Sequence, residues 1–396
     1  MVPCASRAKT IRLSRVLGGK WSFETEPATD CIWVHDSTSG ECIKTNVSSL
    51  LEVRRLLEET GVGDYVAAGY EDRGLAVFTD CAGSRPLFVG HDGDDYVISN
   101  RIQETHGIQT TEAVPGDTAL RLGEKGISSF RLASPDEPDS AERPSLANSL
   151  ELAVQRRIKG RSRVGVTFSG GLDSSLLAFL SKKVSKDEVK LLLVTVFAEG
   201  YGEPSEARKA AEMLDAELVE VAADRRICAD VIRYSKGARI WRTPMDVSLG
   251  VGFVLASRAA YSKGCELLIA GQGADELFGG YAKYEKIATR PDLVARAMEY
   301  DFEHLYQGLA RDAEAIRDGG CEPSFPYLDR LVVNAANSIP PEERVVGGYR
   351  KAPLRETAME LGLPRQLALA PKRAFQYSSG LEKLLRKEIS LRHAPG

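Results

Sequence analysis

The sequence predicts a two-domain α/β protein, with an antiparallel, β-rich N-terminal domain and a C-terminal domain built on a parallel sheet. In the first part, short apolar runs such as residues 75–78 and 86–89 are separated by glycine and aspartate turns, which is the spacing of an antiparallel sheet. From residue 146 onward strands and helices alternate, and this pattern specifies a parallel sheet covered on both faces. A proline-rich, acidic stretch at 133–145 separates the two patterns, because proline and charge oppose both helix formation and burial.

The predicted organisation is therefore a domain at 1–132, a linker at 133–145 and a domain at 146–396. Apolar residues four apart predict the first helix of the second domain. The expected order is a helix over Leu146 to Ile158, a strand from Val164, a helix after the following loop, a strand at Val189–Phe197, a helix at Ser205–Leu214, a strand at Leu218–Val221 and mostly helix from Met298.

Composition excludes several classes of protein. A chain of 396 residues with 43% hydrophobic residues has ordinary globular cores, which argues against a disordered or fibrous protein. The net charge of −4 provides no overall basic field, so we expect no nucleic-acid partner. Seven cysteines without a CxxC pair argue against a zinc knuckle or a secreted disulfide framework. With no apolar run of membrane-spanning length, we expect a cytoplasmic protein without membrane contact.

One loop carries the clearest chemical signal. Residues 164–175 read VGVTFSGGLDSS, a short strand that leads into two glycines, an aspartate and serines. Gly170 and Gly171 let the backbone approach phosphate oxygens, while the N–H groups of the following helix point at the anion. The lysine of the ordinary GxxxxGK[ST] phosphate loop is missing, which favours a loop that holds pyrophosphate as ATP is split between its α and β phosphates. Asp173 is placed to bind the accompanying Mg²⁺.

A second loop follows about a hundred residues later. Residues 267–281 read LLIAGQGADELFGGY, again a buried strand that opens into glycines and acids. Because both loops follow strands of one predicted parallel sheet, Asp275 is expected to face the same Mg²⁺ as Asp173.

Together these segments resemble the synthetase domain of the glutamine-dependent asparagine synthetase family (class B type), which includes the β-lactam and carbapenam synthetases. Residues 320–329, GCEPSFPYLD, are similar to the GxExRxPFLD segment of the family, and KAPLR at 351–355 is similar to its KxxLR. Pro371-Lys372 falls where the family carries a catalytic lysine. The resemblance covers roughly residues 146 to 390 and implies an ATP-pyrophosphatase (PP-loop) domain of the adenine nucleotide α hydrolase-like fold.

The resemblance implies ATP and Mg²⁺ as cofactors and a set of site residues. Lys372 is expected to stabilise charge on the phosphates, and Glu322 is the candidate general base. Gln272 stands where asparagine synthetases carry glutamate and β-lactam synthetases tyrosine, and it cannot take up a proton at ordinary pH. The magnesium ligands are expected to be Asp173 and Asp275, and the nucleotide site is expected to contain Ser169, Gly170, Gly171, Asp173, Ser174, Val196, Gly271, Gly273, Lys351 and Lys372.

The N-terminal part carries a weaker resemblance. Residues 80–88, DCAGSRPLF, look like the DxxGxRPLY segment of the family's glutaminase domain, which is of the N-terminal nucleophile (Ntn-hydrolase) type. That activity needs a cysteine as the first residue, whereas the chain starts Met1-Val-Pro-Cys4. We therefore expect a degenerate, inactive glutaminase-like domain.

The function that follows is an ATP-dependent amide ligase, which adenylates a small-molecule carboxylate and transfers the acyl group to ammonia or an amine. Three alternatives stay open. They are intramolecular ring closure of the β-lactam synthetase type, a tRNA-modifying enzyme of the same superfamily, and a non-catalytic nucleotide-binding scaffold. A homodimer is possible by analogy with other sheet proteins.

Overall fold

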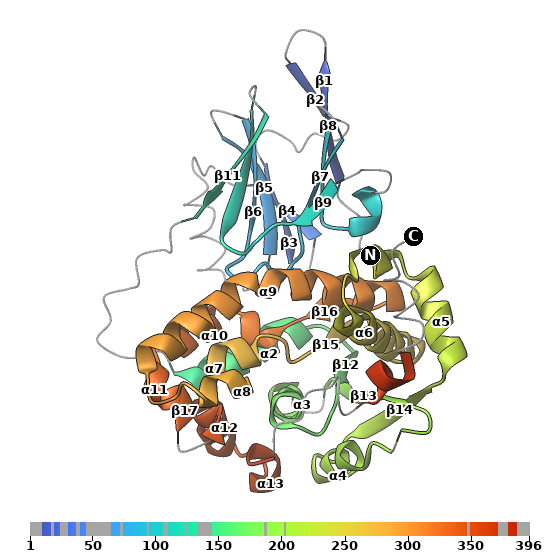
Figure 1. Cartoon of the computed structure of the whole chain (residues 1–396), viewed down its shortest axis with the longest axis vertical. Helices are drawn as coiled ribbons and strands as arrows, with labels where there is room; N and C mark the ends of the chain where they lie inside the picture. Colours follow the sequence, from blue (N-terminus) through green and yellow to red (C-terminus); the bar gives the residue numbers. More distant parts are fainter. Residues whose placement is uncertain are drawn as a thin grey trace. The chain divides into compact units, whose positions relative to one another are not determined.

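The structure is a computed structural model of the chain. It describes residues 10–16, 20–23, 31–36, 40–44, 65–71, 74–92, 95–105, 110–123, 126–132, 145–185, 188–201, 203–346, 349–370 and 379–385. The chain divides into two compact units (Figure 1). One comprises residues 1–143 with 302–310, and the other comprises 144–301 with 311–396. Most of the expected linker, residues 133–144, lies outside the described residues.

Two antiparallel sheets form the first unit, so the predicted antiparallel, β-rich character is confirmed. The five-stranded sheet has the order β2-β1-β8-β7-β9 and consists of β1 (Thr10–Val16), β2 (Lys20–Phe23), β7 (Phe88–Asp92), β8 (Asp95–Ser99) and β9 (Thr110–Ala113). The six-stranded sheet has the order β11-β10-β6-β5-β3-β4 and consists of β3 (Cys31–Asp36), β4 (Gly40–Lys44), β5 (Tyr65–Glu71), β6 (Gly74–Thr79), β10 (Thr118–Gly123) and β11 (Gly126–Arg131).

The DCAGSR segment of the first unit forms a turn that is organised by one buried carboxylate. Asp80 is 1% exposed, and it accepts hydrogen bonds from the backbone N–H groups of Tyr65, Ala82 and Ser84 at 2.9 to 3.1 Å. The Ser84 hydroxyl donates a further hydrogen bond at 2.7 Å. A buried ionised group is stable only with such partners, so these contacts explain the aspartate and the serine of this segment as structural residues.

A five-stranded parallel sheet is the centre of the second unit, as predicted. Its order is β14-β13-β12-β15-β16, with every neighbouring pair parallel. The strands are β12 (Arg163–Thr167), β13 (Lys190–Ala198), β14 (Glu217–Ala223), β15 (Leu267–Ile269) and β16 (Glu322–Ser324).

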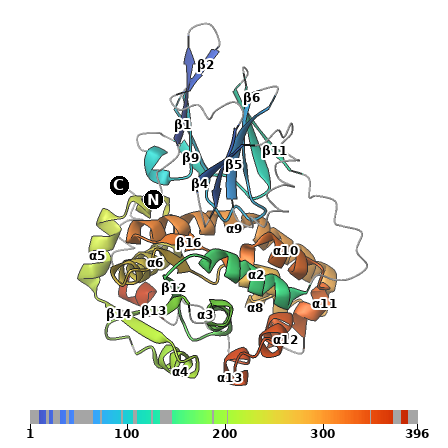
Figure 2. The same cartoon turned by 180° about the vertical axis from the view of Figure 1, so that it is seen from behind.

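The helices between these strands cover both faces of the sheet (Figures 1 and 2). Right-handed crossovers place helices on one face while the chain moves from β12 toward β14, and on the opposite face when it returns toward β16. Accordingly α3 and α4 lie below the sheet in both views and α6 lies above it. The helices of this part are α2 (Leu146–Ile158), α3 (Leu172–Ser185), α4 (Ser205–Met213), α5 (Arg225–Tyr234) and α6 (Pro244–Ser262). The first three confirm the expected helices, whereas α5 and α6 were not predicted.

The remaining residues of the second unit are mostly helical. They form α7 (Ala274–Phe278), α8 (Ala282–Glu285), both ends of α9 (Pro291–Gly319), α10 (Arg330–Asn337), α11 (Pro341–Arg344), the short hairpin β17 (Val345–Val346) and β18 (Tyr349–Arg350), α12 (Ala352–Glu360) and α13 (Arg365–Ala368). The middle of α9, residues 302–310, belongs to the first unit. Within the described ranges, none of the helices combines the length and the apolar character that a membrane span requires.

The strand order fixes where a ligand site can form. The chain leaves β12 toward β13 on one side, and β15 later joins β12 on the other. At such a reversal the loops after the two central strands diverge to opposite faces and leave a crevice at their carboxyl ends. The loops that follow β12 and β15 are the two loops that carry the glycines and acids.

Candidate active site

The first loop is built by the turn from β12 into α3. Gly170 has φ +75°, and a Cβ there would lie 2.6 Å from the Glu206 carbonyl oxygen, so only glycine fits. Two serines fold the loop on itself. The Ser169 N–H donates to the Ser174 hydroxyl at 3.2 Å, and the Gly171 N–H donates to the Ser169 hydroxyl at 3.4 Å. The 14-residue helix α3 starts directly behind this turn, which directs the positive end of its dipole toward the loop.

A pocket of about 130 Å³ lies over this loop and contains four of the residues predicted to bind the nucleotide. Ala370 and Ser379, which also line it, are the described residues on either side of segment 371–378. Lys372 belongs to that segment and therefore lies outside the described residues, as does Cys4 of the expected glutaminase site. The pocket lining is Ser169, Gly170, Gly171, Thr195, Val196, Phe197, Glu203, Pro204, Ser205, Glu206, Ala207, Ala370 and Ser379.

The second loop runs from β15 into the short helix α7. Gly271 lies against Asp173, because a Cβ on this glycine would be 3.3 Å from the Asp173 Cβ. Gly273 has φ +90° and precedes the first residue of α7, while Asp275 lies in the first turn. Gly280 closes the loop, and a Cβ there would meet Asp275 Oδ1 at 1.9 Å. The two predicted loops are therefore packed together.

The two predicted magnesium ligands meet at one lysine ammonium. Lys351 Nζ lies 2.8 and 2.7 Å from the two carboxylate oxygens of Asp173 and 2.6 Å from Asp275 Oδ1. The side chain of Lys351 is 2% exposed. Burial disfavours its charge, but the two carboxylates together outweigh burial and raise the pKa of Lys351. The lysine that was predicted to contact the nucleotide therefore lies between the acids that were predicted to bind the metal.

This carboxylate pair suits Mg²⁺. Mg²⁺ is usually held by one or two carboxylates together with substrate phosphates and water, and seldom by an all-protein cage. Among the described residues, no group of three or more His, Cys, Asp or Glu side chains could hold a metal ion. A cation already bridges Asp173 and Asp275 in the form of the Lys351 ammonium, so the two acids have the spacing that a shared cation needs.

Tyr327 and Glu276 complete the surroundings of the acid pair, and sequence reasoning had not identified either. The Tyr327 hydroxyl donates to the Asp173 carbonyl at 3.0 Å from a fully buried ring. Burial raises the pKa of Glu276 to about 7, with a further contribution from the neighbouring Asp275 charge, and the Tyr281 hydroxyl donates to this carboxyl group. Glu276 is therefore shielded from solvent, whereas the Asp275 side chain is 23% exposed.

Gln272 is held by a buried chain of charges. Its Nε2 donates to the Asp312 carboxylate, Asp312 is paired with Arg311 Nε at 2.7 Å, and Arg311 NH1 contacts Asp246 at 2.6 Å. The Asp312 side chain is 0% exposed, and burial raises its pKa against the opposing effect of Arg311. Asp246 lies at the start of α6, and Asp312 and Arg311 lie on α9. These contacts could not be predicted from the sequence, because charges spaced along a helix normally mark a solvent-exposed face.

Glu322 lies elsewhere on the sheet. Its position on β16 is paired with Leu267, the first residue of β15, whereas Gln272 follows the carboxyl end of that strand. The Glu322 carboxylate contacts Arg317 Nε at 3.5 Å, and Arg317 NH1 contacts Glu314 at 2.9 Å. The structure therefore brings Asp312, and not Glu322, into contact with Gln272.

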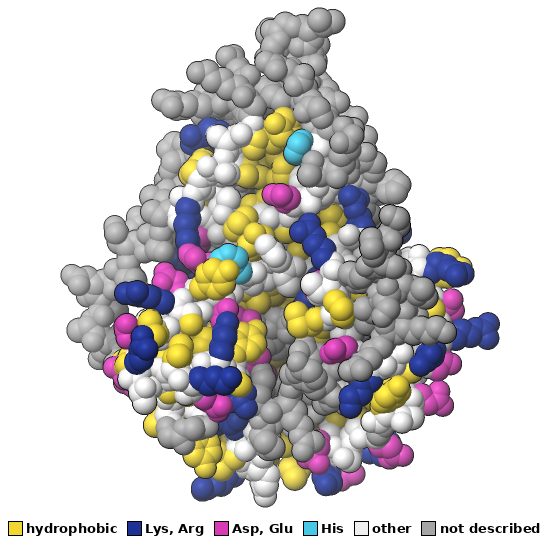
Figure 3. All heavy atoms as spheres, in the orientation of Figure 1, with side chains coloured by type: hydrophobic (Ala, Val, Ile, Leu, Met, Phe, Trp, Pro, Cys, Tyr) yellow, Lys and Arg dark blue, Asp and Glu magenta, His cyan; other side chains and the backbone are white. Residues whose placement is uncertain are grey.

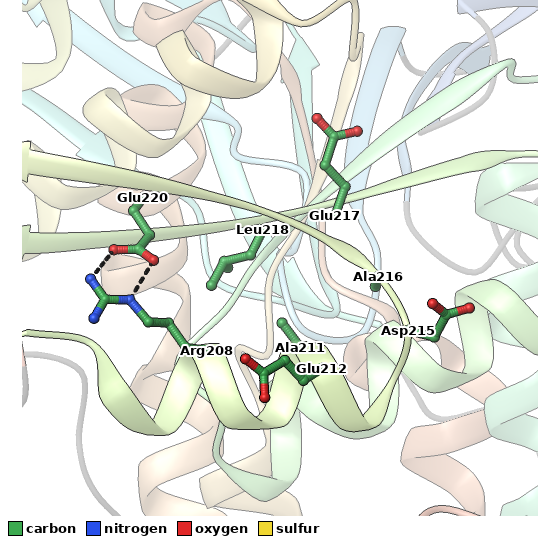
Figure 4. Close-up of a pocket in the computed structure, with 8 residues that line it drawn as sticks. All are labelled: Arg208, Ala211, Glu212, Asp215, Ala216, Glu217, Leu218 and Glu220. Carbon is green, nitrogen blue, oxygen red and sulfur yellow. Dashed lines mark hydrogen bonds and ion pairs between the residues drawn. The ribbon is translucent and has the colours of Figure 1, made fainter.

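A larger surface groove lies along the edge strand β14 of the sheet. It has a volume of about 630 Å³ and lies between α4 and β14 (Figure 4). Its cation, Arg208, is bound to Glu220 at 2.7 Å and also to Glu203. On the face seen in Figure 3, described Lys and Arg side chains of the second unit are interspersed with Asp and Glu side chains. Among the residues that line the groove, no two carboxylates contact one cation in the way that Asp173 and Asp275 contact Lys351, apart from the ordinary surface pairs of Arg208.

Known proteins match the region that contains these loops. The family model for asparagine synthase matches residues 145–318 and 290–394. A putative glutamine-hydrolysing asparagine synthetase of Methanocaldococcus jannaschii is 30% identical over 278 residues, which is 61% of this chain and 50% of that protein. Asparagine synthetase B of Escherichia coli is 26% identical over 330 residues, 76% of this chain and 58% of that protein. The chain thus spans about half the length of the curated relatives it matches.

Two solved structures show a low similarity. NMN synthetase from Francisella tularensis has a TM-score of 0.33 at 12% identity, covering 60% of this chain and 78% of that chain. A U34-tRNA thiolase from Methanococcus maripaludis has a TM-score of 0.28 at 14% identity, covering 63% and 81%. With TM-scores this low, the fold assignment depends on the strand order itself.

Proposed function

Because the chain belongs to the asparagine synthase family, we propose that it is an ATP-dependent carbon–nitrogen ligase that activates a carboxylate as its acyl-adenylate. The observation that carries this proposal is the convergence of Asp173 and Asp275 on one cation position. The two acids follow strands β12 and β15, on either side of the reversal in strand order. A site of this kind suits a nucleotide whose phosphates need both a backbone cradle and a bound cation.

In the first step, the substrate carboxylate attacks the α-phosphorus of ATP. The new bond joins a carboxylate oxygen to that phosphorus, the α–β phosphoanhydride bond breaks, and pyrophosphate leaves. The loop formed by Ser169, Gly170 and Gly171 would hold the departing pyrophosphate through its N–H groups and the start of α3. Asp173 and Asp275 would hold Mg²⁺, which when bound neutralises charge on the phosphates.

The KAPLR segment supports this half of the site from two positions. Lys351 lies at the acids, and Arg355 NH1 donates to the carbonyl oxygens of Ala368 and Ala370 at 2.7 and 3.1 Å. Ala370 is the last described residue before the segment that contains Lys372. Arg355 therefore holds Ala370, which lines the nucleotide pocket. This supports the expected action of Lys372 on the phosphates, which remains a proposal.

In the second step, an amine attacks the acyl carbon, AMP leaves, and the nitrogen must lose a proton. Gln272 cannot accept this proton, but its carboxamide can orient an N–H group of the nucleophile. Asp312 holds the Nε2 end of Gln272 and is a carboxylate close to this position. We propose that Gln272 and Asp312 together form the acceptor side of the site and that the Asp312 carboxylate takes up this proton, with Glu322 as the competing candidate for the base.

The acceptor side favours a nucleophile other than the ammonia and a carboxylate other than the aspartate of the asparagine synthetases. An uncharged carboxamide at 272 replaces the family's acid, and Ser324 replaces an arginine of the GxExRxPFLD segment. Ser324 Oγ is buried and has no hydrogen-bond partner among the described residues. Intramolecular ring closure of a specialised acid is therefore the second candidate function, since polar, uncharged groups suit a larger substrate that carries its own amine.

The proposal is tested by carboxylate-dependent exchange of labelled pyrophosphate into ATP over a panel of amino acids and specialised acids. We expect exchange with at least one acid, AMP as the spent nucleotide, and loss of exchange in Asp173→Ala. Glu212→Ala, in the exposed groove of Figure 4, is the matched control and should exchange normally. Formation of ADP, or binding of ATP without exchange for any acid, would contradict the proposal.

A further inference from the structure

The Lys351 ammonium lies where a metal ion shared by Asp173 and Asp275 would bind. Its ammonium contacts three carboxylate oxygens at 2.6 to 2.8 Å, which are ordinary lengths for charge-assisted hydrogen bonds. A magnesium ion shared by Asp173 and Asp275 would need oxygens of the same two carboxylates at about 2.1 Å. The ammonium therefore occupies the space between the acids that a shared ion would take.

Two further features show that this placement is built into the fold. Lys351 has φ +60°, a left-handed conformation that costs a residue with a Cβ about 1 kcal/mol or more. The lysine stem also passes over Gly280, where a Cβ would come within 2.3 Å of Lys351 Cε. A strained backbone at one residue and an obligatory glycine at another both serve to bring the ammonium between the acids.

Charge explains what this arrangement does in the free protein. Without a cation, two carboxylates in contact repel each other, and each loses solvation in the crevice. With the ammonium between them, the acids are paired and their geometry is held. An incoming divalent ion must displace a buried ammonium, which then needs another anion, because an unpaired buried charge is costly.

We propose that Lys351 is an internal counter-ion which keeps divalent ions from binding when no nucleotide is present, so that the ion is taken up together with a polyphosphate whose oxygens accept hydrogen bonds from the displaced ammonium. This inference rests on the proposed function for the identity of the nucleotide site. The metal ion and the nucleotide would then bind together as a complex, and not one after the other. Lys351 would have two successive partners, the acids first and the phosphates afterwards.

Binding of Mn²⁺ to the full-length protein tests the proposal without any turnover. Free Mn²⁺ is measured by electron paramagnetic resonance, with and without α,β-methylene-ATP, which cannot be split between its α and β phosphates. The Mn²⁺ that the analogue binds in protein-free solution is subtracted. We expect the analogue to tighten Mn²⁺ binding by about tenfold or more, and Mn²⁺ to tighten binding of the analogue by the same factor, as linkage requires. Equal Mn²⁺ affinity with and without the analogue would overturn the proposal.

Lys351→Met removes the ammonium at nearly constant length. In the absence of nucleotide this variant should bind Mn²⁺ about tenfold more tightly than the unmodified protein, and the effect of the analogue should shrink correspondingly. Lys183→Met is the control, since it removes another lysine–carboxylate pair, with Glu151 at 2.8 Å, on the exposed side of α3. Weaker Mn²⁺ binding by a folded Lys351→Met protein would contradict the proposal.

The double variant Lys351→Met with Asp173→Asn shows whether the gained ion is bound at these acids, and we expect the gain to disappear. Should Lys351→Met fail to fold, as judged by circular dichroism, the comparison with and without the analogue in the unmodified protein still decides. The outcome is separable from the proposed function. If Lys351→Met gains Mn²⁺ affinity but the unmodified protein shows no pyrophosphate exchange, the counter-ion proposal is supported and the ligase proposal is refuted. If the unmodified protein shows exchange but Lys351→Met binds Mn²⁺ with unchanged affinity, the ligase proposal is supported and the counter-ion proposal is refuted.

Discussion

The two sides of the proposed site differ in how closely they keep the pattern of the asparagine synthase family. On the nucleotide side, both glycine loops and both acids are present, and Asp173 and Asp275 meet at one cation. On the acceptor side, Gln272 replaces an acid and is held by Asp312 of α9, while Glu322 is paired with Arg317 at the other end of the strands. Under the proposed function, activation of a carboxylate and choice of its nucleophile would therefore be carried by separate residues and could change separately.

The largest expected effect separates the two sides directly. Asp275→Asn removes one charge from the acid pair, so pyrophosphate exchange should fall by about a hundredfold to a thousandfold, as for loss of a group that stabilises charge in the transition state. Gln272→Ala should leave exchange within about threefold of normal and lower only amide formation. If Gln272→Ala abolished exchange as well, the two sides would not be separable.

The next effect discriminates between the two candidate bases, Asp312 and Glu322. Asp312→Asn disturbs the group that holds Gln272, and we expect amide formation to fall by about tenfold to a hundredfold with exchange retained. Glu322→Gln should change amide formation by less than about threefold, because Glu322 contacts Arg317 and pairs with the first residue of β15, whereas Gln272 follows the end of that strand. Single-turnover product formation after adenylation measures both variants. The reverse ranking would make Glu322 the base.

A third variant concerns the packing of the nucleotide side. Gly280→Ala would place a Cβ 1.9 Å from Asp275 Oδ1 and 2.3 Å from Lys351 Cε. Overpacking of this kind typically costs about 1 to 3 kcal/mol, which a denaturant titration of the unfolding equilibrium can measure. We also expect exchange to fall, because the acids must separate. Unchanged stability and exchange would mean that the acids and the lysine are not held in one fixed arrangement.

The smallest expected effect is that of Asp246, which pairs with Arg311 next to the acceptor side, on the free energy of unfolding as a function of pH. Burial opposes ionisation of Asp246, but the hydrogen bond and charge of Arg311 and the bonds from Thr243 outweigh it and lower the pKa of Asp246. A carboxyl group with a lowered folded-state pKa stabilises the fold above its unfolded pKa of about 3.9, and this contribution is lost as the pH falls further.

Asp246→Asn should therefore lower the free energy of unfolding by about 1 to 2 kcal/mol at pH 7, and the difference should shrink below about pH 4. Asp224→Asn is the matched control, since Asp224 caps α5 in an exposed position and asparagine caps helices equally well. A deficit in Asp246→Asn that is the same at pH 3 and pH 7 would show that the ion pair with Arg311 does not cause it.

The sequence predicts the nucleotide side well because strand, glycine turn and helix follow one another locally. The segment from Val164 to Ser175 contains its whole loop, and the strand alternation alone puts Asp275 at the same edge of the sheet. The elements predicted from Leu146 to Val221 are all found within one or two residues of their expected ends.

The acceptor side could not be predicted in this way, because its partners come from α9. Arg311, Asp312, Glu314 and Arg317 form a charged stripe on this helix, and such a stripe normally lies in solvent. Here all four side chains are buried, since each charge is paired within the fold. The KxxLR motif likewise indicated a phosphate ligand at Lys351, whereas its place between the two acids depends on a backbone conformation that the sequence does not reveal.

The contact between Lys351 and Asp173 joins residues 178 positions apart in the chain. During synthesis of the protein, the helices α3 and α7 that contain the two acids leave the ribosome before the lysine does, so the acids are made before their partner. Contacts of such long range also form late in folding, since the intervening chain has to be ordered first. A nucleotide that binds only after Lys351 has reached the two acids would shift the folding equilibrium toward the native state by mass action. Its presence should therefore protect newly made chains from proteolysis.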